Sequence, residues 1–225
     1  DRSDSKKRVR AVASGRVSVA AAITLSSCLA LGAVFLAVVT HREQVVTLIT
    51  LYLVLGLFYC LRGREIPLVD VFVLAAGFVI RLLLGCALVS VAASNWLLFC
   101  GSSLALFLVL AKRHADVAQH AKETYRASLS GYRLSFLEQS QSILAATVIV
   151  SYAMYCVDGQ NLVKGREFLS VPFVTFGVLE YLRASGNIPL KSSPVDILLT
   201  SPRLMVCGFV WFVSVCLSLP LRYWS

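Results

Sequence analysis

The chain has 225 residues, of which 58% are hydrophobic and only 15% are charged, and its formal net charge is +9. Its mean hydropathy is +0.78, whereas an ordinary globular chain is about 45–50% apolar and about 25% charged. A soluble core with this excess would leave large apolar patches in water. The composition therefore excludes a soluble domain, a disordered tail and a disulfide-stapled secreted module, and it predicts a polytopic membrane protein.

Seven stretches of the chain are apolar enough to be membrane-spanning helices, for which about 20 mostly apolar residues are needed. They must be helical because lipid offers no partner for backbone N–H and C=O groups. The predicted spans are 17–40, 44–61, 67–93, 95–111, 141–157, 168–182 and 205–221. The sequence therefore predicts an all-α transmembrane helix bundle that forms one domain over residues 1–225.

The basic residues are distributed unequally between the two sides of this bundle. Sixteen of the 21 Lys and Arg residues fall on the side of the N-terminus, four fall on the other side, and Arg81 lies within the third span. Because cytoplasmic segments carry an excess of Lys and Arg, the side of the N-terminus is predicted to be cytoplasmic. Its segments are 1–16, 62–66, 112–140 and 183–204. Topology and attraction to anionic lipid account for such charge; we favour an additional role in binding an anionic ligand.

Asp70 and Arg81 place two ionisable groups in the third predicted span, where such groups are costly and usually face a cavity or a partner. They are eleven residues apart, which puts them on one helix face about 16 Å apart in height. This separation is too large for a salt bridge, and we interpret the two residues as two levels of one polar cavity. A buried structural Arg81 bonded to helix carbonyls is the alternative.

The segment after the fourth span, expected to be an ordered loop, begins Lys112-Arg113-His114-Ala115-Asp116 and continues to His120. If the helix runs on, Arg113, Asp116 and His120 share a face at spacings of three and four residues. Asp116 with His120 is a candidate metal pair, although two ligands do not make a site. A solvated helix face is the alternative.

Residues 1–18 read DRSDSKKRVRAVASGRVS, in which acidic residues are followed closely by a basic cluster. This pattern suits a metal-bound phosphate, because carboxylates hold Mg²⁺ while Lys and Arg bind the remaining phosphate oxygens. A plain basic flank of the first span is the alternative. The seven cysteines, by contrast, form no C-x-x-C pair and are interpreted as small hydrophobic residues between helices.

These motifs resemble those of the UbiA-type membrane prenyltransferase superfamily. The start of the chain is similar to the end of its first aspartate-rich motif, D-x-x-H-P-x-K-R-x-R-P-I-A-S-G. Residues 59–71 (YCLRGREIPLVDV), 110–113 (LAKR) and 131–133 (GYR) are similar to segments of its decaprenyl-phosphate phosphoribosyltransferase branch. The resemblance covers nearly the whole chain.

The resemblance implies nine helices around a cytoplasm-facing cavity in a bacterial plasma membrane, so that two of the nine would be missing from the seven predicted spans. We accordingly expect the chain to be truncated inside the first motif and to be inactive by itself. The implied activity is transfer of a 5-phosphoribosyl group from phosphoribosyl pyrophosphate to a polyprenyl (decaprenyl) phosphate, with release of pyrophosphate and dependence on Mg²⁺. The implied partners are these substrates and the membrane, with no nucleic acid.

The resemblance also implies roles for individual residues. Asp1 and Asp116 would hold Mg²⁺, and with Asp70, which would line the cavity near the sugar, they make up the implied catalytic set. No general base is needed because the acceptor phosphate is already ionised. The implied substrate-binding residues are Lys7, Arg8, Arg10, Arg64, Arg81, Lys112, Arg113, Arg126, Tyr59 and Tyr132.

The chain departs from the family pattern at several positions. Asp4 replaces a His, Arg64 replaces a Lys, and Glu180 stands where an Arg is common; Ser5 and Ala11 replace prolines. Arg64 keeps the charge of the Lys but not its geometry.

Two other functions are compatible with the sequence. Prenyl transfer to an aromatic acceptor would be favoured by an aspartate-rich second motif, of which only Asp116 is present here. A transporter or non-catalytic membrane partner would be favoured by inverted repeats, and the chain has no internal repeat.

Overall fold

The computed structural model describes residues 11–12, 14–119, 131–158, 163–187 and 194–219, and over these residues the protein is all-α, as the sequence predicts. The described residues form eight α-helices and one short 3-10 turn, η2. Their bounds are α1 Val19–Val39, α2 Glu43–Leu61, η2 Gly63–Glu65, α3 Val69–Leu88, α4 Asn95–Gln119, α6 Leu134–Asp158, α7 Val171–Asn187, α8 Pro194–Thr200 and α9 Pro202–Ser218.

Five helices, α1, α2, α3, α4 and α6, are long and apolar enough to cross a membrane, and they coincide with the first five predicted spans. The sixth and seventh predicted spans form α7 and α9, which have 17 residues each. Of these two, α9 is a shorter apolar helix. The protein is therefore an integral membrane protein, while the count of seven spans stays a prediction. The short helix α8 was not predicted.

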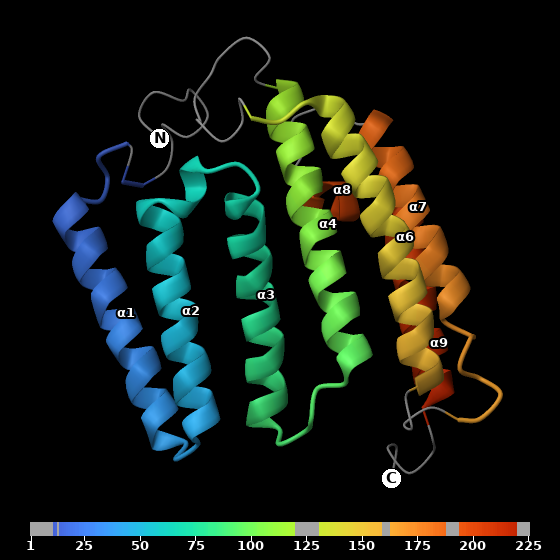
Figure 1. The fold of residues 1–225 in the computed structure, drawn as a ribbon, viewed down its shortest axis with the longest axis horizontal. Coiled ribbons are helices and arrows are strands. Elements are labelled where there is room, and N and C mark those ends of the chain that lie inside the picture. Colours follow the sequence, from blue (N-terminus) through green and yellow to red (C-terminus); the bar gives the residue numbers. More distant parts are fainter. Residues whose placement is uncertain (1–10, 13, 120–130, 159–162, 188–193, 220–225) are drawn as a thin grey trace.

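Helices α1 to α4 stand side by side in chain order, and α6, α7 and α9 are grouped beside α4 (Figure 1). One end of the bundle carries the α2–α3 connection, the last turns of α4 and the beginning of α6 (Figure 1). We call it the basic end, because the described segments that meet there carry several basic residues: Arg62, Arg64, Lys112, Arg113 and Arg133. That this end faces the cytoplasm stays a prediction.

Two clusters of buried apolar residues hold the bundle together. The larger one joins α4 and α6 to α7, α8 and α9, and the smaller one joins α3, α4 and the beginning of α6. The smaller cluster consists of Val71, Val109, Leu110, Tyr132 and Leu137. It lies directly beneath the basic end, so it fixes the ends of three helices relative to one another.

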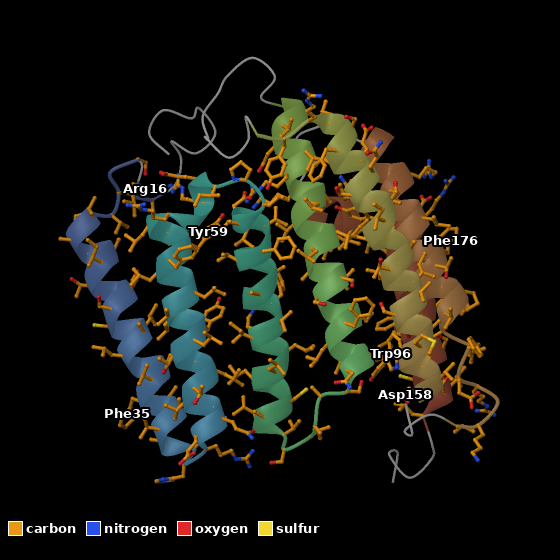
Figure 2. All side chains as sticks on the ribbon, in the orientation of Figure 1. Arg16, Phe35, Tyr59, Trp96, Asp158 and Phe176 are labelled. Carbon is orange, nitrogen blue, oxygen red and sulfur yellow. The ribbon has the colours of Figure 1, made fainter. Side chains whose placement is uncertain are left out.

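The outer faces of the helices remain strongly apolar. Leu31 and Phe35 of α1 are 71% and 68% exposed, and side chains of this kind project outward along the bundle, with Phe35 among them (Figure 2). In water such faces would drive association, whereas in a bilayer they contact lipid tails. All seven cysteines are free thiols, in agreement with the prediction that they form no disulfide framework.

The segment between the fourth and fifth spans differs from the prediction. Helix α4 continues to Gln119 and α6 begins at Leu134, so residues 112–119 and 134–140 are helical rather than loop. The continuation has two physical reasons. Val117 packs on the smaller apolar cluster, and Arg113 forms an ion pair with Asp116 one turn later. The condition under which Arg113 and Asp116 share a helix face is therefore met, whereas His120 lies outside the described residues.

Candidate functional site

The beginning of α3 is fixed by a tight turn at Leu68. Leu68 has φ 65° and ψ −43°, and the Val69 N–H donates to the Pro67 carbonyl at 2.8 Å. These values describe a γ-turn with positive φ, a strained conformation that is rare for residues other than glycine. The turn places Asp70 in the first turn of α3, where its side chain is completely buried.

Tyr132, which precedes α6, ties this turn to the rest of the bundle. Its hydroxyl accepts the Leu68 N–H at 2.6 Å and donates to Asp70 Oδ1 at 2.7 Å. Burial, together with Asp70, raises the pKa of Tyr132 to about 12, although the hydrogen bond from Leu68 opposes the shift. The phenol therefore keeps its proton at neutral pH and acts as a permanent donor to Asp70.

Arg113 of α4 is the centre of the polar contacts at the basic end. Its Nε lies 2.7 Å from Asp70 Oδ2, and its Nη1 donates to Asp116 Oδ2 at 2.9 Å. The Nε–H is not directed at Asp70 Oδ2 as a hydrogen bond requires, so the first contact is an ion pair without a hydrogen bond. The Arg113 side chain is only 1% exposed. One buried guanidinium thus neutralises part of the charge of two carboxylates.

Two further groups complete the arrangement, which we call the Arg113 cluster: Asp70, Arg113, Asp116, Tyr59 and Tyr132. The Tyr59 hydroxyl, from the last turn of α2, accepts a weak hydrogen bond of 3.5 Å from Arg113 Nη2. Figure 2 shows Tyr59 at the same end of the bundle as the α2–α3 connection. Asp116 is the charged member with a partly exposed side chain, of which 32% is exposed. The cluster therefore reaches from a closed interior at Asp70 to the surface of the basic end at Asp116.

All five members of the Arg113 cluster were predicted to belong to the site from the sequence, and the structure brings them together from α2, α3, α4 and the beginning of α6. Arg64 and Lys112 are exposed at the basic end and have no contact of this kind with the cluster in the described structure. Five other predicted site residues lie outside the described residues: Asp1, Lys7, Arg8, Arg10 and Arg126.

Arg81 is not part of the Arg113 cluster. Its side chain is exposed, its Nη1 donates to the Tyr52 hydroxyl at 3.4 Å, and its guanidinium carbon lies 4.3 Å from the centroid of the Phe78 ring. The alternative that Arg81 is a buried structural residue is therefore wrong. Asp70 and Arg81 have no contact partner in common among the described residues, so the structure gives no support to a single polar cavity joining them.

The residues of the basic end can be compared with what Mg²⁺ requires. Among the described residues there is no group of three or more His, Cys, Asp or Glu side chains that could enclose a metal ion. Mg²⁺, however, is commonly bound by one or two carboxylates, with substrate phosphates and water supplying the remaining oxygens. Asp116, a partly exposed carboxylate at the basic end, fits that mode of binding, whereas Asp70 is enclosed by Arg113 and Tyr132.

Two features of the site were not foreseen from the sequence. The Leu68 turn contributes a backbone N–H, and a backbone group leaves no signal in residue type, although the preceding Pro67 marks the helix start. His114 of α4 lies 3.4 Å from Glu138 of α6. That contact was not predicted, because the segment between the fourth and fifth spans was expected to be a loop, whereas both helices extend into it.

An all-α membrane bundle with an ion-paired cluster at its basic end defines an integral membrane protein with a candidate site for anionic substrates. A family model, the UbiA prenyltransferase family, matches residues 1–188. The chain therefore belongs to the UbiA prenyltransferase family, and it is a transferase of that family.

Two distant relatives match nearly all of the chain, and a third matches about half of it. It is 25% identical to a decaprenyl-phosphate phosphoribosyltransferase of Corynebacterium glutamicum over 97% of the chain and 67% of that protein. It is 27% identical to a decaprenyl-phosphate phosphoribosyltransferase of Mycobacterium tuberculosis over 96% of the chain and 71% of that protein. An uncharacterized protein, y4nM, of Sinorhizobium fredii is 35% identical over 52% of the chain and 22% of its own length.

Proposed function

We propose that the protein transfers a 5-phosphoribosyl group from phosphoribosyl pyrophosphate to the phosphate of a polyprenyl lipid such as decaprenyl phosphate, in a bacterial plasma membrane. The observation that carries this proposal is the Arg113 cluster at the basic end of a UbiA-family bundle. The printed names of the two phosphoribosyltransferase relatives, which match over 96–97% of the chain, support the choice of substrates.

The reaction exchanges one bond at C1 of the ribose. An oxygen of the lipid phosphate forms a bond to C1, the bond from C1 to the diphosphate oxygen breaks, and pyrophosphate leaves with the electron pair. The acceptor oxygen is already ionised, so no proton has to be removed. The main demand on the protein is to stabilise the negative charge that develops on the leaving diphosphate.

The residues of the basic end suit that demand. Arg64 and Lys112 are exposed cations at the basic end, which allows them to bind phosphate oxygens of the two substrates. Lys7, Arg8, Arg10 and Arg126 are proposed to add to this set from outside the described residues. The polyprenyl tail would lie against the apolar helices, whose outer faces already require a lipid environment.

Asp116 is proposed to hold Mg²⁺, together with Asp1 and the substrate diphosphate. When bound, the ion would supply positive charge to the leaving diphosphate without a proton transfer. Asp116 is oriented for this role by Arg113 while keeping part of its carboxylate exposed.

The test is a transfer assay with the protein expressed together with any residues that flank this chain in its gene. Membranes receive phosphoribosyl pyrophosphate labelled in the ribose, decaprenyl phosphate and Mg²⁺. We expect label in the organic phase, no label after chelation, and about 100-fold slower transfer in Asp116→Asn, as for removal of a group that stabilises transition-state charge. The control variant, Lys164→Met, removes an exposed charge at the opposite end of the bundle and should leave the rate unchanged.

A parallel reaction separates this proposal from its rival. The same membranes receive a polyprenyl diphosphate and an aromatic acceptor such as 4-hydroxybenzoate. Prenylation of the acceptor, with no label transferred from phosphoribosyl pyrophosphate by folded protein, would replace the proposal with aromatic prenyl transfer. Absence of both products from folded protein would favour a non-catalytic membrane role.

A further inference from the structure

We propose that Arg113 and Asp70 do not touch the substrates but are positioning residues, which hold the Asp116 carboxylate at the mouth of the site for a metal–diphosphate complex. This inference rests on the proposed function and sharpens it. The sequence had placed Arg113 among the phosphate ligands and Asp70 near the sugar. The contacts of both residues favour a role in positioning Asp116 over direct contact with the substrates.

Burial separates the three charged residues of the cluster. The side chains of Asp70 and Arg113 are 0% and 1% exposed, whereas that of Asp116 is 32% exposed. A substrate phosphate approaching from the basic end therefore meets Asp116 first. To reach that phosphate, Arg113 would have to leave both carboxylates, and Asp70 would then be a buried charge without its cation, which is strongly unfavourable.

The chain of contacts behind Asp116 is continuous. Asp116 is bound by Arg113, Arg113 is paired with Asp70, and Asp70 accepts a hydrogen bond from Tyr132. Tyr132 in turn holds the strained Leu68 turn that begins α3. Asp116 is thus anchored through α4 to α3 and to the beginning of α6. Such supporting groups fix the direction of a metal-ligating carboxylate.

The guanidinium is suited to this task in a way that an ammonium is not. Arg113 donates from Nη1 to Asp116 and from Nη2 to Tyr59, and its Nε lies 2.7 Å from Asp70 Oδ2 in an ion pair, so one planar group contacts three partners. Lys offers a single charged nitrogen without this fixed fork. Arg113→Lys therefore keeps the charge but cannot hold both carboxylates in place.

The charge of the three residues is also informative. Two carboxylates and one guanidinium sum to one negative charge, and the exposed member is Asp116. A carboxylate is a ligand for Mg²⁺ and not for a bare phosphate. The arrangement fits Mg²⁺ that arrives with a diphosphate, and it disfavours direct contact between the cluster and a diphosphate without metal.

The experiment compares Arg113→Lys and Asp70→Asn with the wild-type protein and with Lys164→Met as control, in the transfer assay at varied Mg²⁺. For the first two variants we expect the Mg²⁺ concentration for half-maximal rate to rise about 10–100-fold, the range typical for supporting groups of a metal site. The KM values for phosphoribosyl pyrophosphate and lipid phosphate, measured at saturating Mg²⁺, should change less than about 3-fold. A raised KM with an unchanged Mg²⁺ requirement would identify Arg113 as a phosphate ligand and overturn the proposal, as would no change in either.

A binding measurement keeps this inference separate from the transferase reaction. Thermal unfolding of the purified protein is followed in detergent with Mg²⁺ and inorganic pyrophosphate as the probe. Wild type should be stabilised by the two together, Asp116→Asn should lose the shift, and both positioning variants should need about 10–100-fold more Mg²⁺ to reach it. If no phosphoribosyl transfer is detected but wild type and the three variants still differ in this way in the unfolding measurement, the proposed function is wrong and the positioning role stands. Equal Mg²⁺ requirements in wild type and folded variants would overturn the role.

Discussion

Helix α3 carries two charged side chains eleven residues apart, and their surroundings are opposite. Asp70 is completely buried and is held by Arg113 and Tyr132 from two other segments. Arg81 is exposed and lies against two aromatic rings, those of Phe78 and Tyr52. From the sequence alone, both residues are predicted to line one polar cavity within the membrane. Among the described residues, Asp70 is a charge that joins several elements, whereas Arg81 contacts its own helix and the neighbouring α2.

The difference follows from where each group lies along the helix. Asp70 is at the helix start, next to the ends of α2, α4 and α6, so partners from several elements can converge on it. Arg81 lies eleven residues further along α3 with its side chain exposed, and there its cation contacts the rings of Phe78 and Tyr52. The contrast predicts large effects when the Asp70 contacts are broken and small ones when the Arg81 contacts are.

The largest expected effect comes from removing the cation of the Arg113 cluster. Arg113→Met leaves Asp70 buried without its ion-pair partner, so the free energy of unfolding should fall by about 3–5 kcal/mol. Thermal or denaturant unfolding in detergent measures this loss. Adding Asp70→Asn should recover part of it, because the unpaired buried charge is then gone. If Arg113→Met alone is as stable as wild type, the ion pair does not hold the helix ends together.

Tyr132→Phe should have an intermediate effect. The substitution leaves the Leu68 N–H and Asp70 Oδ1 without the hydroxyl that joins them, and the expected loss is about 1–3 kcal/mol. The same unfolding measurement detects it. Phe136→Leu, which removes the ring stacked on Tyr132 but no hydrogen bond, is the control that separates hydrogen bonding from ring packing. If Phe136→Leu loses more stability than Tyr132→Phe, the effect is one of ring packing.

The pH dependence of this effect has a definite sign. Burial and Asp70 raise the pKa of Tyr132 to about 12, from about 10 in an unfolded chain. The stability that the protonated phenol contributes is fully present below pH 10 and is lost as the pH rises to about 12. The difference in stability between wild type and Tyr132→Phe should therefore be constant from pH 7 to 9 and should shrink between pH 10 and 12. A constant difference to pH 12 would contradict the raised pKa.

Features of the basic end that depend on local sequence were predictable, whereas those that depend on how the helices pack were not. The span positions follow from apolar length, and the pairing of Arg113 with Asp116 follows from a spacing of three residues once the helix continues. The contact of Arg113 with Asp70, 43 residues away in the sequence (113 − 70), depends on how α3 and α4 pack. The burial that makes Arg113 a supporting residue is likewise a property of packing, which residue type and spacing do not encode.

The smallest effect is expected for Arg81→Met, the variant that tests the other side of the comparison. The lost cation–π contact contributes about 0.5–1 kcal/mol at an exposed site, and an apolar side chain is better tolerated among lipid tails than a charge. The two changes oppose each other, so the free energy of unfolding should stay within about 1 kcal/mol of wild type. Arg81→Lys is the matched variant, since it keeps the cation. If Arg81→Met is stable but loses phosphoribosyl transfer while Arg81→Lys retains it, the cation of Arg81 serves the substrates as the sequence proposed. The contrast between the two charges of α3 would then be one of stability alone and not of function.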